Sequence, residues 1–595
     1  MKSKSTILWF MIAATLATAI WILNTYLRPP APGDRSILAG MRPERVTAVQ
    51  VIPAGGRAIS VIQSNQTWLI EKPIAYPAQT AAIEGLLDAL QKLTPLMSFT
   101  AGEMSGHKNA DAEFGFDNPQ FTLDVSAGDQ VWHLRVGNKT APGDGVYVRV
   151  VGATGAFVTD TAWLQFLPHD ADSWRDTTLV NVPDSPDWLL VTNGAMSIEL
   201  RRNLTNHLWS MVRPMAARAN NQRIVSALQQ LSMASVSKFV SDDPKADLTT
   251  YGLEPAALDV WLGNGTNLAT AVHVGKEAKG APNEVYARRE GLTSVVTTPK
   301  AALAPWQGTV AEFRDPNLFE LTAPVAEIEV HGQHNFSVQL QGSNTWSVAG
   351  EKFPVDASLV VGLIKTLAGL QITNFVQDVV TSAGLQSYGL LPDPPTITLR
   401  SAVGNTNSDI ARLQFGTSTN GQIYVKRADE DFVYGVPVYR VNELVLFGDY
   451  YRDHRIWSFS EADVAQVTLK QNGKTRQLVR NGTNDWSLAA GSQGIINSPA
   501  VEETIHRLGQ LSSFAWLGRK GGSIGITTNS LSVTVELKSG EKRAVTFGQT
   551  VPIPNLNTAT YLATVTLDGE PWAFVFPPVL APFIQDYLNI PADTP

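Results

Sequence analysis

The chain has 595 residues, 44% of them hydrophobic and 17% charged, a composition typical of a folded protein that is too long for one hydrophobic core. A formal net charge of -8 works against binding to a phosphate backbone, which needs a concentrated basic face, so we expect no nucleic-acid partner. The sequence contains no cysteine, which excludes disulfides, thiolate catalysis, and zinc or iron–sulfur sites with sulfur ligands.

The amino terminus has the pattern of a membrane anchor. A short basic lead, MKSKST, precedes an uncharged apolar run at residues 7–23, and a helix of that length just spans a bilayer core of about 30 Å. Ala17-Thr18-Ala19 fits a signal-peptidase cleavage site, but the apolar run continues past it. We therefore expect an uncleaved, single-pass signal anchor at residues 1–28, followed by a linker at residues 29–44.

The charges that flank the apolar run give conflicting signals about orientation. A strict positive-inside count leaves the large part of the chain in the cytoplasm, because the basic residues after the run outnumber those before it. A basic lead next to the apolar run is nevertheless the usual layout of a signal anchor, and long domains are translocated largely regardless of charge. We expect a protein of the bacterial cytoplasmic (inner) membrane whose large C-terminal part is periplasmic. The residues counted are Lys2 and Lys4 before the run, and Arg28, Arg35, Arg42 and Arg45 after it.

Beyond residue 44 the sequence repeats with a period of about 140 residues. Each copy opens with two β-rich runs around a tight turn, of which Asn193-Gly194 and Asn472-Gly473 are the strongest hairpin signals. A tryptophan then follows an Asn-containing turn, and the residue two positions on is apolar, so both side chains share one buried face of a strand. We expect core packing; the alternative is a row of rings that stack on a ligand such as a sugar. Trp68, Trp209, Trp346 and Trp486 lie 141, 137 and 140 residues apart.

An amphipathic helix and a glycine turn come next in each copy. The helix is indicated by apolar residues at helical spacing, such as Ile83, Leu86, Leu87 and Leu90. The turn reads FGFDNP, YGLEP, YGLLP and, in a degenerate form, IGI. Glycine between two apolar residues suits a chain reversal, since it adopts a backbone conformation closed to other residues. We predict an architectural role for these glycines, which are Gly115, Gly252, Gly389 and Gly525.

The rest of each copy consists of alternating strands and a closing element. The strands are expected to end at Gly137, Gly275, Gly416 and Gly548, and a strand with a tyrosine follows about ten residues later. The first three copies close with a short helix and an aromatic-Arg-Asp element that the fourth copy lacks. We expect these Arg-Asp pairs to be structural ion pairs at domain junctions, with a ladder that contacts a protein partner as the alternative. The pairs are Arg175 and Asp176, Arg314 and Asp315, and Arg452 and Asp453.

The repeats predict the fold class. We expect an α+β protein of four tandem domains, each about ββαβββα, with a mainly antiparallel sheet and one packed helix. A unit of about 140 residues can bury its own core, and short connections favour a semi-rigid rod. The predicted domains are 45–183, 184–322, 323–460 and the divergent 461–595.

One sequence motif offers a candidate catalytic residue. Gly521 to Gly525 fits the GxSxG pattern of a serine hydrolase, with Ser523 as the nucleophile. That motif needs a strand, a sharp turn and a helix, whereas here a strand, LSVTVEL, follows, and the other copies have no serine at this point. We therefore predict that the chain is not an enzyme.

Metal and cofactor sites are also not indicated. His331 and His334 flank a hairpin turn, and at i and i+3 of a strand they point to opposite faces. The acidic cluster of Asp170, Asp172 and Asp176 lacks the glycine and the terminal glutamate of a calcium loop. We predict that the chain binds no metal and no cofactor.

Together, the anchor, the tryptophan after a polar turn, the YGLxxP turn, the tyrosine strand and the Arg-Asp element resemble the bacterial domain of unknown function 4340 (DUF4340) in four copies. The resemblance implies an envelope component of the kind encoded beside ABC-2 type transporters and gliding-motility or export proteins. It carries over no catalytic residues. We expect a membrane-anchored, extracytoplasmic scaffold with protein partners in an ABC-type transporter complex. The alternatives are a module that binds a ligand or polysaccharide in interdomain grooves and, third, an envelope hydrolase.

Overall fold

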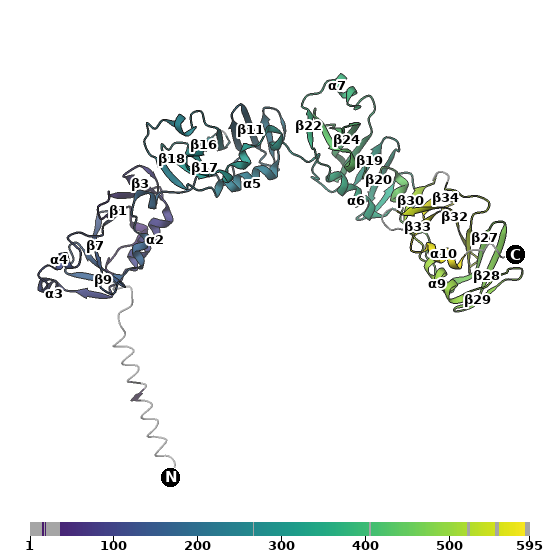
Figure 1. Ribbon diagram of the computed structural model, residues 1–595, viewed down its shortest axis with the longest axis horizontal. Helices are drawn as coiled ribbons and strands as arrows, with labels where there is room; N and C mark the ends of the chain where they lie inside the picture. The colour runs from purple at the N-terminus through teal and green to yellow at the C-terminus, as the bar shows by residue number, and fades with distance from the viewer. Residues whose placement is uncertain are drawn as a thin grey trace, which may run out of the picture. The chain divides into compact units, whose positions relative to one another are not determined.

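The computed structural model describes residues 15, 16, 18, 36–265, 267–403, 406–519, 524–553 and 558–588. The chain divides into two compact units, residues 1–314 and 315–595. Each unit holds two antiparallel sheets, so that the described chain contains four sheets in all (Figure 1). The strands of each sheet fall within one of the four predicted ranges, and helices are few and short by comparison.

The first sheet of unit 1 has nine strands in the order β4-β3-β2-β1-β6-β7-β8-β9-β5. Its strands are β1 (Ala48–Pro53), β2 (Ile59–Ser64), β3 (Thr67–Lys72), β4 (Tyr76–Pro77), β5 (Met97–Phe99), β6 (Phe121–Ala127), β7 (Gln130–Lys139), β8 (Gly145–Val150) and β9 (Ala156–Asp160). Its α-helices are α2 (Thr80–Gln91), α3 (Ala101–Gly106) and α4 (Ala110–Glu113).

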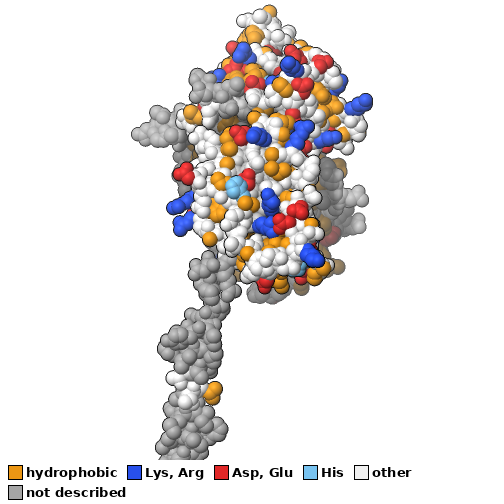
Figure 2. All heavy atoms as spheres, turned by 90° about the vertical axis from the view of Figure 1, so that its left-hand side faces the viewer, with side chains coloured by type: hydrophobic (Ala, Val, Ile, Leu, Met, Phe, Trp, Pro, Cys, Tyr) orange, Lys and Arg blue, Asp and Glu red, His pale blue; other side chains and the backbone are white. Residues whose placement is uncertain are grey.

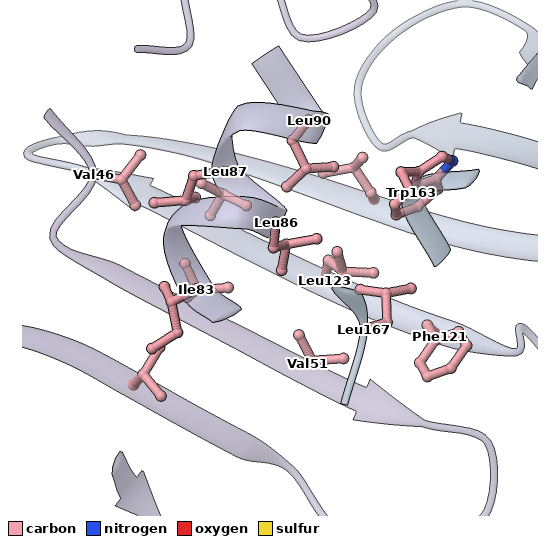
Figure 3. Close-up of a cluster of buried hydrophobic side chains, with 14 of the residues drawn as sticks. Val46, Val51, Ile83, Leu86, Leu87, Leu90, Phe121, Leu123, Trp163 and Leu167 are labelled. Atoms are coloured by element: carbon pink, nitrogen blue, oxygen red, sulfur yellow. The ribbon is translucent and has the colours of Figure 1, made fainter. Parts of the chain in front are cut away.

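Helix α2 packs on this sheet by the face that the sequence predicts. Figure 3 shows its four apolar side chains in one buried cluster with residues of the strands, such as Val51 and Leu123. Burial of each such side chain contributes about 1.5–3 kcal/mol, which is enough to hold a twelve-residue helix that would be marginal alone. These side chains are Ile83, Leu86, Leu87 and Leu90, each at most 1% exposed.

The second sheet of unit 1 repeats the same order, β13-β12-β11-β10-β15-β16-β17-β18-β14. Its strands are β10 (Trp188–Asn193), β11 (Met196–Arg202), β12 (Trp209–Arg213), β13 (Ala217–Arg218), β14 (Lys238–Ser241), β15 (Leu258–Asn264), β16 (Asn267–Ala278), β17 (Ala281–Arg289) and β18 (Val295–Pro299). Helix α5 (Asn221–Ser232) corresponds to α2.

The two sheets of unit 2 have eight strands each, in the orders β21-β20-β19-β23-β24-β25-β26-β22 and β29-β28-β27-β31-β32-β33-β34-β30. The first contains β19 (Glu327–His331), β20 (Phe336–Gln341), β21 (Thr345–Val348), β22 (Asn374–Gln377), β23 (Thr396–Val403), β24 (Thr406–Thr419), β25 (Gln422–Arg427) and β26 (Val433–Pro437), with α6 (Ala357–Ala368), α7 (Ser382–Ser387) and α8 (Val438–Val441). The second contains β27 (Val464–Gln471), β28 (Lys474–Gly482), β29 (Asp485–Leu488), β30 (Ala515–Gly518), β31 (Ser532–Leu537), β32 (Lys542–Ile553), β33 (Thr558–Leu567) and β34 (Glu570–Val575), with α9 (Ser498–Leu508) and α10 (Ala581–Tyr587).

The observed order of elements has more strands than the predicted ββαβββα. At least three strands precede the helix, because the tryptophan lies on a third strand of the opening meander. A short strand directly after the helix pairs with the last long strand of each sheet, and four strands follow it. These short edge strands are β5, β14, β22 and β30, three or four residues long, and they carry too few alternating positions to be recognised in the sequence.

The domain boundaries differ from the predicted ones in a regular way. The segment after each Arg-Asp element belongs to the next domain. After the first element, Leu179 and Val180 lie in the core of the second domain. Leu38 and Met41, predicted to be linker, lie likewise in the first core.

The division between the two units falls between Arg314 and Asp315, before the predicted boundary between residues 322 and 323. Backbone hydrogen bonds secure the entering segments, among them Ile37 to Leu93, Leu179 to Ala234, Leu318 to Leu370, and Ile456 to Leu511.

The predicted membrane anchor at residues 7–23 lies outside the described residues, apart from residues 15, 16 and 18. Within the part of the chain that the structure describes, no helix combines the length and the apolar character needed to span a membrane.

Candidate interaction sites at the domain junctions

The glycine turn docks onto a bulged strand in all four domains. Gly115, Gly252, Gly389 and Gly525 have φ of 79°, 69°, 70° and 74°, in the left-handed region that favours glycine. Opposite each turn, the strand shifts register beside a second glycine, and a Cβ there would lie about 2 Å from a backbone carbonyl oxygen of the turn. These second glycines and their contacts are Gly137 with Phe114, Gly275 with Tyr251, Gly416 with Tyr388, and Gly548 with Ile524.

The second glycines therefore do not end their strands, as the sequence suggested. Strands β7, β16, β24 and β32 continue beyond them through the bulge. The bulge explains why each domain carries two glycines here: one takes the left-handed conformation of the turn, and the other leaves room for the carbonyl oxygen of the turn.

The tyrosine strand completes this arrangement in the first three domains. The ring of the tyrosine packs on the aromatic residue of the glycine turn. In the fourth domain Ile524 takes the place of that aromatic residue, and Tyr561 packs on Phe547 at 5.3 Å instead. The three conserved contacts are Phe114 with Tyr147 at 4.5 Å, Tyr251 with Tyr286 at 5.0 Å, and Tyr388 with Tyr424 at 4.7 Å between ring centroids.

The four repeat tryptophans lie in the cores of their domains. Their indole rings offer no open face on which a ligand could stack. Trp68, Trp209, Trp346 and Trp486 are 2%, 3%, 7% and 4% exposed.

The three Arg-Asp elements share one backbone geometry. The arginine forms an isolated bridge to the preceding domain, and the residue three positions later forms one to the following domain. Between them, the aspartate Oδ1 accepts a hydrogen bond from the backbone N–H two residues on, which makes the turn between the two bridges. The bridges are Arg175 to Ala78 and Thr178 to Ser235, Arg314 to Ala219 and Asn317 to Gln371, and Arg452 to Val355 and Arg455 to Ser512.

At the first junction the side chain of Arg175 connects the two domains of unit 1. Its guanidinium donates to both carboxylate oxygens of Asp242, at 3.0 and 2.9 Å, and is 2% exposed. It also lies over the ring of Phe239, 4.4 Å from the centroid, and Phe239 packs on Tyr76 of the first domain. Burial would raise the pKa of Asp242, but hydrogen bonds from Arg175 and Ser294 outweigh it and hold that pKa below its ordinary value.

The partner of Arg175 is therefore Asp242 in the next domain, and not the adjacent Asp176. Asp176 faces Arg289 of the second domain, with its Oδ2 3.3 Å from a guanidinium nitrogen. Arg289 also donates to the backbone oxygens of Thr178 and Leu179, the latter at 3.2 Å. Both side chains of the first pair thus connect to the second domain.

The second pair lies where the chain passes from one unit to the other. Arg314 and Asp315 are 4% and 5% exposed. Within unit 2, Asp315 Oδ1 accepts hydrogen bonds from the backbone and the side chain of Asn317, at 2.9 and 3.1 Å. Arg427 donates to the oxygen of Leu318 at 3.1 Å, as Arg289 does to that of Leu179.

At the third junction Arg452 lies between aromatic rings of the two domains of unit 2. Its guanidinium is 4.3 Å from the ring centroid of Trp572 and 5.4 Å from that of Phe353, which themselves pack edge to face. Its carboxylate partner is Asp568, at 3.0 Å. The side chain of Asp453 forms the turn, and its backbone carbonyl oxygen accepts a hydrogen bond from the Trp516 indole N–H at 3.3 Å. The arginine–aromatic contact is thus common to the first and third junctions, whereas the carboxylate comes from different elements.

A cleft of about 680 Å³ lies beside this third junction, between the two domains of unit 2. One side is formed by the β19–β20 turn with Phe336 and by Phe447, and the other by the end of β30. Arg519 at that end is held by Glu351 and by Glu570, the latter at 2.9 Å, and its backbone N–H donates to Asp449.

The sequence offers Ser523, two histidines and an acidic cluster as candidates for catalysis or metal binding. Ser523 lies outside the described residues. His331 and His334 are exposed, and His331 lies 3.0 Å from Glu329 on its own strand. Asp170 caps a short helix, and Asp172 lies 3.4 Å from Arg175. In the described ranges no three His, Asp or Glu side chains are grouped so that they could hold a metal ion.

Surface charge is mixed on the face shown in Figure 2, where basic and acidic side chains alternate and neither sign gathers into a patch. Such a face presents no concentrated basic surface of the kind that a phosphate backbone requires.

Comparison with known proteins gives one match. A family model described as "Domain of unknown function (DUF4340)" matches residues 68–186, 209–352 and 346–523. Each matched segment begins at a repeat tryptophan and contains one glycine turn and one Arg-Asp element. No curated protein and no solved structure matches the chain.

Proposed function

The chain belongs to the DUF4340 family, as the sequence predicted, and we propose that it is a membrane-anchored scaffold whose domains present fixed surfaces to protein partners outside the cytoplasm. The observation that carries this proposal is the double role of the Arg-Asp segment. At the first junction, residues 175–178 bridge to one domain and then to the next, and the guanidinium of Arg175 joins them again through Asp242.

Such a junction favours a scaffold over flexibly tethered domains. Two backbone bridges and a buried ion pair have definite geometry, so the two domains of a unit keep one relative orientation. A fixed orientation lowers the entropy lost when a partner binds both domains together. The junction arginines are buried, so they orient the domains while other surfaces remain for the partner.

The apolar run at residues 7–23 supports attachment to the cytoplasmic membrane, and the basic lead before it supports export of the rest. The family resemblance supports an accessory role in an ABC-2 type export system, with subunits of that transporter as partners. No catalytic activity is part of the proposal.

Crosslinking in native membranes tests the proposal. A photoreactive residue is introduced at exposed positions of the full chain, and captured proteins are identified by mass spectrometry. We expect capture of integral membrane subunits of a transporter, and weaker capture in the Arg175→Ala variant, because its two domains no longer hold one orientation. The matched control is Arg213→Ala, an exposed arginine of the same unit. Capture of soluble cytoplasmic proteins alone, or equal capture in all three proteins, would contradict the scaffold role.

A further inference from the structure

We infer that the cleft between the two domains of unit 2 is a binding site for a neutral pyranose sugar. Its volume of about 680 Å³ lies within the range of small-molecule sites, roughly 300–1,000 Å³. Three separate segments converge on it: the β19–β20 turn, the residues around Gly448, and the end of β30. The inference depends neither on the cellular location of the chain nor on its scaffold role.

One wall of the cleft is aromatic and apolar. Phe336 and Phe447 line it together with Val348 and the ring of His334, which lies 6.2 Å from that of Phe447. Gly448 is packed closely between them, since a Cβ there would lie 3.3 Å from atoms of both Phe336 and Val348. Aromatic faces carry negative charge density and attract the polarised C–H bonds on the flat face of a pyranose ring.

The opposite wall carries three carboxylates around one guanidinium, so it has an excess of negative charge. Glu351, Asp449 and Arg519 are each 28% exposed, so they are partly desolvated and yet still accessible from the cleft. The guanidinium of Arg519 contacts Glu351, lies 3.6 Å from Asp449 and pairs with Glu570 at 2.9 Å. These pairs hold the carboxylates in place before any ligand arrives, which limits the ordering cost of binding.

The charges of this wall bear on the class of ligand. The excess of carboxylates repels an anion, and their remaining lone pairs can accept hydrogen bonds from the hydroxyl groups of a neutral ligand, to which the guanidinium can also donate. The exposed amides of Gln333 and Asn335 add further donors and acceptors at the rim. Asn335 already uses its Oδ1 to accept from the backbone of Gly332 at 2.9 Å, which orients its amide nitrogen. A ring with one apolar face and several hydroxyls fits both walls.

Saturation-transfer NMR on the full chain in detergent tests the inference. The probes are the methyl pyranosides of glucose, galactose, mannose and N-acetylglucosamine at millimolar concentration, with a lysine derivative blocked at both ends as a cationic probe. We expect transfer to the ring protons of at least one glycoside, and roughly tenfold weaker binding in Phe447→Ala, which loses an aromatic face.

Two further variants keep the test decisive. Gln333→Ala removes an exposed rim amide and is expected to weaken binding without affecting folding. Phe514→Ala, an exposed phenylalanine that is not part of the cleft lining, is expected to bind like the wild type. Transfer to none of the glycosides, transfer that Phe447→Ala and Gln333→Ala leave unchanged, or binding of the lysine derivative alone would overturn the inference.

Discussion

Replacement of Arg175 by alanine removes the ion pair that joins the two domains of unit 1. The guanidinium is 2% exposed and the Asp242 side chain 26% exposed. Breaking a buried pair costs about 3–5 kcal/mol, and the partial exposure of Asp242 places this pair at the lower end. The lost cation–π contact with Phe239 adds about 1 kcal/mol, so we expect a destabilisation of about 3–4 kcal/mol.

Hydrogen exchange measured by mass spectrometry on the whole protein reports the stability of the first junction separately from that of the rest of the chain. The backbone N–H of Asp176 donates to Pro77 at 2.9 Å, and that of Val236 donates to Thr177 at 2.7 Å, so both report on opening of the junction. A loss of about 3–4 kcal/mol increases their exchange by roughly 100-fold to 1,000-fold. Asp242→Asn should cost less, about 1–2 kcal/mol, because a neutral amide can still accept one hydrogen bond.

A double-mutant cycle separates the pair from other effects. With both changes present, we expect the total cost to be smaller than the sum of the single costs by about 1 kcal/mol, since either single change already removes the attraction between the two charges. The control is Arg213→Ala, whose side chain is 69% exposed and whose partner Glu199 keeps its hydrogen bonds from Trp188 and Arg201, so a smaller cost is expected. Unchanged exchange at Asp176 and Val236, or an equal effect of Arg213→Ala, would refute the assigned role of Arg175.

Two further predictions concern single domains. Gly416→Ala places a Cβ 2.1 Å from the backbone oxygen of Tyr388 and should destabilise the third domain by about 3 kcal/mol. The control is Gly362→Ala, in open space on α6, which should stabilise the domain by about 0.5–1 kcal/mol. Equal effects of the two changes on urea unfolding would contradict the contact between the glycine turn and the bulge. The hydrogen bond that the His273 ring donates to Asp259 raises the pKa of His273, with help from Glu290 and against the opposing effect of burial. The raised pKa stabilises the folded second domain fully below about pH 6.5, and this contribution is lost as the pH rises through the folded-state pKa of His273. The second domain should therefore become less stable as the pH rises. In His273→Gln the hydrogen-exchange rates of this domain should no longer show this pH dependence.

The sequence predicted those features that repeat with a fixed spacing. The burial of Trp68 and its counterparts, the apolar face of α2 and the left-handed turn at Gly252 all follow from local patterns of period two, of helical period, or of glycine between apolar residues. The family prediction, which depends on the same landmarks, is confirmed by the match to three segments.

Features that depend on contacts between distant segments were missed. The sequence suggested a strand end at Gly137, where the structure has a bulge. Glycine is needed there because the backbone oxygen of Phe114, on the glycine turn, lies against it. Leu179 looked like the end of a domain, because its partner Ala234 lies beyond the next helix. The partners of the junction arginines, Asp242 after β14 and Asp568 in the β33–β34 turn, occupy different places in their domains, so no spacing rule identifies them.

The cysteine-free sequence makes the location of the domains directly measurable, since a single introduced cysteine has no competitor. Ile495, which is 95% exposed in the fourth domain, is replaced by cysteine and treated with a membrane-impermeant maleimide in spheroplasts, before and after lysis. An exported scaffold predicts full labelling before lysis. Labelling that appears only after lysis would place the domains in the cytoplasm and contradict the proposed function.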